Sequence, residues 1–191
     1  MAQQAKIVQY GGTEVISLDE ARDYLRVDHT DDNAFITELI KIVRMQVFND
    51  TNTAVVETEV TEYFDKFPSD GIITLRYAGE FANAPVITYY NSDNTLSTLN
   101  YLTDWQRVSN SGMPTIQFYT TPSLFDRQDA LSIHYHVKPQ NDDSIRTLKM
   151  AMYLLIGHFY DNRSAVTFGS PNELPIGYQR IINQYKNYMW K

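Results

Sequence analysis

The chain has 191 residues, a hydrophobic fraction of 43%, a formal net charge of −7 and no cysteine. This length fits one domain, with or without an inserted lobe. The lack of cysteine excludes disulfides, thiolate metal sites and cysteine nucleophiles, and is typical of a chain made in a reducing cytoplasm. We expect no membrane segment and no signal peptide, because no apolar run approaches the roughly 20 residues of a membrane span. A nucleic-acid clamp is also disfavoured, since such a protein clusters its lysines and arginines.

The first part of the chain, residues 1–53, is predicted to hold an arm followed by two helices. Residues 1–13 are expected to be extended and poorly ordered. Ser17 and Glu20 have the spacing of a capping box, in which each side chain accepts a hydrogen bond from the other residue's backbone. This motif predicts a short helix over residues 18–26.

Two longer helices are predicted from apolar residues that recur at the spacing of one helical face. Thr30 is expected to cap the first of them, over residues 31–50. The second runs over residues 144–166, with Asn141 as its cap, and opens the third part of the chain, residues 139–191. A helix this apolar needs partners, so we expect it to be the central helix of a bundle.

The third part also contains a loop at 167–173 and a last helix from Pro175 to about residue 188. Four residues near the end of the long helix are expected to take part in the packing of the bundle: Gly157, Phe159, Tyr160 and Arg163. Gly157 is unfavourable in a helix interior, and its presence therefore indicates a close approach of a neighbour.

The middle part, residues 54–138, changes to a period of two and is rich in β-branched and aromatic residues. About six short strands are predicted, near residues 56–61, 72–77, 85–90, 95–102, 115–119 and 131–137. In the last strand four apolar residues share one face, while Ser132, His134 and His136 share the other. The predicted fold is therefore α+β, a bundle of about four helices with an inserted antiparallel β lobe.

Motifs that would indicate an enzyme are scarce. The sequence contains no GxGxxG, phosphate loop, GxSxG or HExxH pattern. His134 and His136 lack a third ligand close in sequence, so a solvated or interface face is favoured over a metal site. His158 is favoured as a core histidine over a catalytic base. A solvated face or edge protection is favoured for Glu57, Glu59 and Glu62. We expect no enzymatic activity, no cofactor and no metal.

Three segments together resemble the head–tail connector (adaptor, or head-completion) proteins of tailed bacteriophages. They are ISLDEARDYLRVDHTDDNAFITELIKIVR at 16–44, LLIGHFYDNRSAV at 154–166 and LPIGYQRIINQYK at 174–186. The resemblance implies a structural virion protein, assembled in the host cytoplasm. It further implies a homo-oligomeric ring of about twelve copies below the portal protein. Such a ring extends the DNA channel and docks a neck stopper or tail-completion protein.

If the chain forms such a ring, its uneven charge distribution suggests which residues face the DNA channel and which contact a partner. Residues 14–38 carry a net charge of −6, and five of their acids are expected to face the channel: Asp19, Glu20, Asp23, Asp31 and Asp32. Acids repel phosphates, so genomic DNA would pass without specific binding. Residues 178–191 contain no acid, and five of the last residues are expected to contact the portal or another partner: Tyr185, Tyr188, Met189, Trp190 and Lys191.

Two other functions remain open from the sequence. One is a carbohydrate- or receptor-binding module on a helical base, with an aromatic platform of Tyr89, Tyr90, Tyr101, Trp105 and Tyr119. The other is an enzyme that uses His158 or the pair of histidines on the last strand. The resemblance favours the connector over both.

Overall fold

The computed structural model describes residues 3–110, 112–139, 142–163 and 174–186. The chain divides into two compact units. The β unit comprises Met1–Gly12 and Val56–Gln140, and the helical unit comprises Thr13–Val55 and Asn141–Lys191. Among the described residues, none of the helices has the length and apolar character needed to cross a bilayer.

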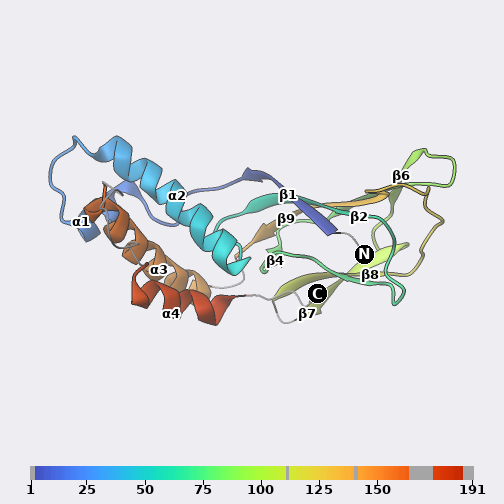
Figure 1. The fold of residues 1–191 in the computed structure, drawn as a ribbon. Helices are drawn as coiled ribbons and strands as arrows, with labels where there is room; N and C mark the ends of the chain where they lie inside the picture. The colour runs from blue at the N-terminus through green and yellow to red at the C-terminus, as the bar shows by residue number, and fades with distance from the viewer. Residues whose placement is uncertain (1–2, 111, 140–141, 164–173, 187–191) are drawn as a thin grey trace, which may run out of the picture. The chain divides into compact units, whose positions relative to one another are not determined.

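The helical unit contains four helices within the described residues (Figure 1). They are α1 (Leu18–Leu25), α2 (Asn33–Thr51), α3 (Asp142–Asp161) and α4 (Ile176–Tyr185). Helix α3 packs against each of the other three. Its apolar stripe lies in a core with the stripes of α1, α2 and α4, which includes Ile36, Val43, Met152, Leu155 and Ile182. The helical face that the apolar spacing predicted to be buried therefore lies in this core.

The predicted start of α1 is confirmed. The backbone amide of Glu20 donates to Ser17 Oγ over 3.2 Å, and the Ser17 amide donates to Glu20 Oε2 over 2.9 Å. Helix α1 ends at Leu25 and is capped by Arg26, whose left-handed backbone lets its amide donate to carbonyl groups of the last turn.

Two helix boundaries differ from the prediction. Thr30 does not cap α2, because Asp32 occupies the N-cap position and its side chain makes no capping bond. The Asp32 carboxylate instead accepts hydrogen bonds from Tyr160 of α3 and from Arg163, as described below. Helix α3 ends at Asp161, before the predicted end at residue 166, and residues 164–173 and Asn141 lie outside the described residues.

The β unit contains two antiparallel sheets among the described residues. The larger sheet has the strand order β1-β2-β9-β5-β6, with β4 also paired to β9, and the smaller has the order β3-β8-β7. The strands of the larger sheet are β1 (Gln3–Tyr10), β2 (Thr58–Phe64), β4 (Glu80–Phe81), β5 (Val86–Tyr90), β6 (Leu96–Leu99) and β9 (Leu131–Lys138). Those of the smaller sheet are β3 (Ile72–Thr74), β7 (Trp105–Asn110) and β8 (Met113–Phe118). The α+β class is confirmed.

The expectation of a poorly ordered N-terminal arm is wrong. Residues 3–10 form β1, an edge strand paired along β2 with one irregularity between Ile7 and Gln9. The β unit is therefore not a simple insertion between helices, since its first strand precedes them. The arm was misassigned because its sequence, QQAKIVQY, lacks clear alternation, and its order comes from β2.

Strands β2 and β9 alternate as predicted and form the centre of the larger sheet. Thr58, Val60, Glu62 and Phe64 of β2 are buried, as are Leu131, Ile133, Tyr135 and Val137 of β9. The prediction of a solvated or edge role is wrong for Glu62. It is fully buried and accepts hydrogen bonds from Tyr135 Oη over 2.5 Å and from the Arg76 amide over 2.8 Å. These donors satisfy a carboxylate that the alternation directs into the core.

Candidate functional site

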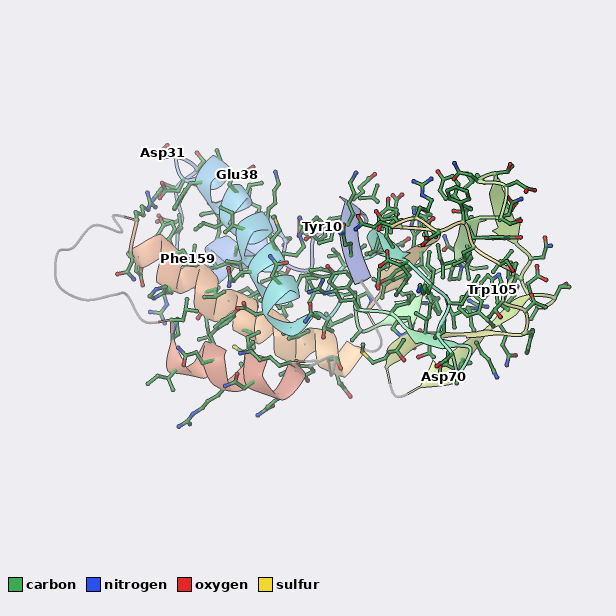
Figure 2. The ribbon with its side chains drawn as sticks, turned by 45° about the vertical axis from the view of Figure 1, so that its right-hand side comes forward. Tyr10, Asp31, Glu38, Asp70, Trp105 and Phe159 are labelled. Atoms are coloured by element: carbon green, nitrogen blue, oxygen red, sulfur yellow. The ribbon has the colours of Figure 1, made fainter. Side chains whose placement is uncertain are left out.

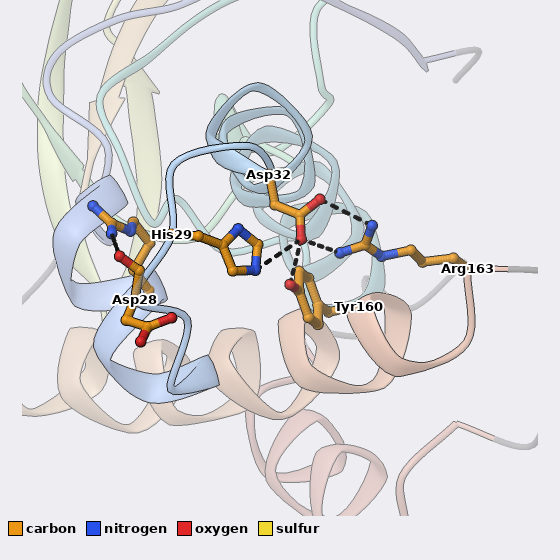
Figure 3. Close-up of polar contacts among 6 residues, drawn as sticks. Asp28, His29, Asp32, Tyr160 and Arg163 are labelled. Carbon is orange, nitrogen blue, oxygen red and sulfur yellow. Dashed lines mark hydrogen bonds and ion pairs between the residues drawn. The ribbon is translucent and has the colours of Figure 1, made fainter.

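The start of α2 is joined to the C-terminal end of α3 by an ion-pair cluster (Figure 3). Asp32 accepts two hydrogen bonds from the Arg163 guanidinium, of 3.0 Å and 2.6 Å, and one of 2.5 Å from Tyr160 Oη. The guanidinium also lies over the rings of Tyr160 and Phe35, at 4.3 Å and 4.8 Å from their centroids. This two-pronged contact orients the carboxylate as well as neutralising it.

The cluster changes the titration of its members. The hydrogen bonds from Arg163 and then from Tyr160 lower the pKa of Asp32 from 3.8 to about 2. The same contact with Asp32 raises the pKa of Tyr160 and of Arg163. Asp32 is therefore charged at neutral pH, but its charge is compensated by Arg163, and it is a poor candidate for repelling DNA.

Glu20, another of the predicted channel-facing acids, is also compensated. Its Oε1 lies 2.6 Å from Lys149 Nζ of α3, and this contact lowers the pKa of Glu20. Lys149 and the contact across to α3 were missed by the sequence analysis. The ion pair joins residues 129 positions apart, and no local pattern indicates it.

The remaining three predicted acids, Asp19, Asp23 and Asp31, are exposed, and none has an ion pair within the described part of the chain. A shallow pocket on α1 and the turn after it is lined by Asp19, Arg22, Asp23, Arg26, Val27 and Asp28. The two arginines in this pocket reduce its negative charge. Figure 2 shows Asp31 near the N-terminal end of α2 and Phe159 on α3.

Gly157 faces α1. A Cβ atom at this position would lie 3.4 Å from Cε1 of Tyr24, which is an ordinary contact distance. The Tyr24 ring stacks on Tyr153, with centroids 4.9 Å apart. A larger side chain would therefore displace Tyr24, whereas a methyl group fits. Phe159 is partly buried against the helical core.

The expected partner-contacting segment is described only at its start. Tyr185, the last residue of α4, is partly buried against the helical core. The other four predicted contact residues, Tyr188, Met189, Trp190 and Lys191, lie outside the described residues. Tyr178 of α4 is buried, and its hydroxyl donates to Asp50 of α2 over 2.5 Å.

The aromatic platform of a carbohydrate binder is not formed as expected. Trp105 is 1% exposed, and its Nε1 donates to the Leu99 carbonyl over 3.3 Å. Tyr101 and Tyr119 are exposed, but Trp105 belongs to the core of the β unit. His158 is partly exposed and lies beside Phe159.

The predicted pair of histidines has a third neighbour that the sequence did not indicate. Glu59 of β2 lies beside His134 and His136 of β9, because the two strands pair with Glu59 opposite His136. No third ligand lies close to the two histidines in sequence, but Glu59 is close to both in space. Alternation predicts which face of β2 carries Glu59 and which face of β9 carries the histidines. Only the pairing of β2 with β9 shows that these two faces lie on the same side of the sheet.

Within the described residues, the Asp32 cluster and the Glu20–Lys149 pair connect helices, and the buried Glu62 has two hydrogen-bond donors. The family model for head completion protein matches residues 14–188. The chain therefore belongs to the head completion protein family, and the predicted membership of the head–tail connector proteins of the phage neck is confirmed.

Solved structures with the same fold come from gene transfer agent (GTA) particles. A chain from the virion of a native GTA particle has a TM-score of 0.76 and 15% identity, covering 98% of this chain and 97% of its own. Chains from the neck of a native particle computed with C12 symmetry and of an empty particle computed with C6 symmetry have TM-scores of 0.73 and 0.72. Their identities are 14% and 15%, with the same coverage. No curated protein sequence matches the chain.

Proposed function

We propose that this chain forms a ring of twelve copies below the portal, which extends the DNA channel and docks a neck stopper or tail-completion protein. The match to the head completion family over residues 14–188 carries this proposal. The shared fold with neck chains computed with C12 and C6 symmetry supports a ring. The role needs no catalytic step and no cofactor, and it places the protein in the virion after assembly in the host cytoplasm.

Assembly on the portal is the direct test. We expect the isolated chain to be monomeric or weakly associated, and to form a ring when purified portal is added. Mass photometry and negative-stain microscopy of the two proteins, alone and mixed, measure this. A tight dimer that portal leaves unchanged would contradict the proposal.

In this ring the four helices would act as a bundle-like base that presents the C-terminal segment to the portal. The proposed anchor is Tyr185 with residues 188–191, in a stretch where Arg180 and Lys186 supply positive charge and no acid is present. Aromatic residues beside cations are common anchors at interfaces.

Truncation after Asn187 tests the anchor. We expect a normal circular dichroism spectrum and lost cosedimentation with portal. Tyr119→Ser is the matched control, because it removes an aromatic ring that is 51% exposed on the β unit. Undiminished attachment of the truncated chain would contradict the anchor, and loss of folding would assign the segment to the core.

We also propose that the exposed acids Asp19, Asp23 and Asp31 line the channel and leave the DNA free to move. Replacing all three with lysine should slow genome ejection and give the assembled ring affinity for DNA, which falls with added salt. The matched control replaces three exposed acids of the β unit, Asp70, Asp93 and Asp126. Equal effects of the two triple variants would contradict this orientation.

A further inference from the structure

One face of the paired strands β2 and β9, together with the residue before β2, gathers two imidazoles and two carboxylates. One ligand atom from each of Glu59, His134 and His136 lies within 4.8 Å of the other two. Glu59 Oε1 is 3.3 Å from His134 Nε2. Glu57 Oε1 is 3.1 Å from His136 Nδ1. The neck role proposed above uses none of these side chains.

The other nitrogen of His134 is also engaged. Its Nδ1 lies 3.0 Å from Thr61 Oγ1, a hydroxyl on the same face of β2. With the ring proton on Nδ1 and donated to this hydroxyl, Nε2 presents a lone pair toward the Glu59 carboxylate. In this tautomer a cation can bind beside the two acceptors, which are 3.3 Å apart, whereas with the proton on Nε2 His134 donates to Glu59 directly. A metal-bound histidine has this arrangement, because its second nitrogen donates to an outer partner.

The surroundings of the cluster hold it in place. Strand β2 is paired with β1 on one side and with β9 on the other, and β9 is paired with β5. The opposite face of both strands is the buried core, so the backbone positions of the ligands are fixed. The ligand side chains are 24–37% exposed, which leaves an ion a path from solvent.

We propose that Glu59, His134 and His136 bind a divalent transition-metal ion of the zinc type, with Thr61 and Glu57 as outer partners. Imidazole nitrogens favour zinc and its neighbours over calcium and magnesium. In a tetrahedral zinc site the ligand atoms lie about 3.4 Å apart, so side-chain rotation must shorten the longest separation, which is within 4.8 Å, by up to about 1.4 Å. Three protein ligands leave the fourth position to water.

The bound ion would cross-link the two central strands of the larger sheet. It would bind the folded chain and not the unfolded one, so it would raise the stability of the β unit as its concentration exceeds its dissociation constant. The probes are Zn²⁺, followed by isothermal titration calorimetry, and Co²⁺, followed by visible absorption of its tetrahedral complex. The full chain is used after treatment with a chelator.

We expect one ion per chain and a rise in melting temperature with Zn²⁺ that Mg²⁺ does not produce. Glu59→Gln, His134→Gln and His136→Gln should each abolish the Co²⁺ absorption. Thr61→Val should weaken Zn²⁺ binding by about 10-fold to 100-fold, because it removes an outer partner and no ligand. Circular dichroism checks that each variant is folded.

His29→Asn is the matched control. His29 is also exposed and lies 3.9 Å from a carboxylate, Asp32, but in the helical unit. This variant should bind Zn²⁺ as the parent chain does. The proposal is overturned if the parent chain binds no Zn²⁺ at millimolar concentration, or if the three ligand variants bind it as tightly as the parent. Stabilisation on mild acidification without metal binding would overturn it in favour of protonated histidine–glutamate pairs.

Discussion

Both units join a tyrosine hydroxyl to a carboxylate over 2.5 Å, but they do so at different depths. In the β unit Tyr135 and Glu62 are both 0% exposed. In the helical unit Tyr160 contacts Asp32, which is 19% exposed and also paired with Arg163. Equal bond lengths therefore accompany very different costs of losing the bond, because a buried carboxylate has no water to replace the lost donor.

The titration of the two tyrosines reflects this difference. Burial, with the nearby Glu62 as the second cause, raises the pKa of Tyr135 well above its usual value. The hydrogen bond to Asp32 is the first cause that raises the pKa of Tyr160. The deep contact belongs to the folding of the sheet, and the shallow one connects two helices by charge.

Gly79 in the β unit and Gly157 in the helical unit differ in the room that they leave for a side chain. A Cβ atom at Gly79 in the β unit would lie 2.4 Å from the Lys138 carbonyl oxygen and 2.6 Å from Val137 Cγ2. Gly79 also has a φ of +146°, which L side chains rarely adopt. At Gly157 in the helical unit a Cβ atom only touches Tyr24. A side chain is therefore expected to cost more at Gly79 than at Gly157.

The largest expected effect is that of Gly79→Ala. The methyl group would meet the backbone of β9, and we expect a loss of about 3 kcal/mol in the free energy of unfolding. Urea denaturation followed by circular dichroism measures it. Gly157→Ala is the matched control, which should leave stability unchanged or raise it by up to about 1 kcal/mol, since alanine favours a helix. Similar losses in both variants would remove the contrast between the units.

The next effect concerns the buried carboxylate. Tyr135→Phe leaves Glu62 with the Arg76 amide and without its hydroxyl donor. We expect a loss of about 2 kcal/mol in the free energy of unfolding, because a buried acceptor loses a partner. Tyr119→Phe, at a position 51% exposed, controls for the loss of a hydroxyl and should have no measurable effect. An unchanged stability of Tyr135→Phe would contradict the role of burial.

A smaller loss is expected for Tyr178→Phe in the helical unit. Asp50 would lose the tyrosine hydroxyl but keep a hydrogen bond of 3.0 Å from Gln46 Nε2, and it is only partly buried. We expect a loss of about 1 kcal/mol, measured by the same denaturation. A loss larger than that of Tyr135→Phe would show that the burial of the carboxylate does not determine which variant loses more stability.

The Asp32 cluster is expected to contribute least to stability at neutral pH, and its contribution changes with pH. The folded pKa of Asp32 is lowered from 3.8 to about 2, so its contribution is fully present above pH 3.8 and is lost as the pH falls toward 2. Asp32→Asn should flatten this part of the stability profile, measured by thermal melts across that range. Asp31→Asn, at the exposed neighbouring position, should leave the profile unchanged. Identical profiles for the parent chain and Asp32→Asn would contradict the pairing with Arg163.

Local patterns in the sequence were sufficient for the helices and for the faces of the central strands. Ser17 and Glu20 are three residues apart, so their capping bonds form as soon as the first turn of α1 does. The apolar stripe of α3 and the alternation of β9 likewise follow from spacing within one element. The three family-like segments were sufficient for the class of protein.

Only the tertiary structure decided which of these elements meet. The pairing of β1 with β2 turned an expected arm into a strand, and the pairing of β2 with β9 brought Glu59 to two histidines more than 70 residues later. Asp32 and Arg163 are 131 residues apart, and their contact compensates the charge of one of the predicted channel-facing acids. The periodicity within one element is set by neighbouring residues, whereas partners distant in sequence are chosen by the packing of the whole unit.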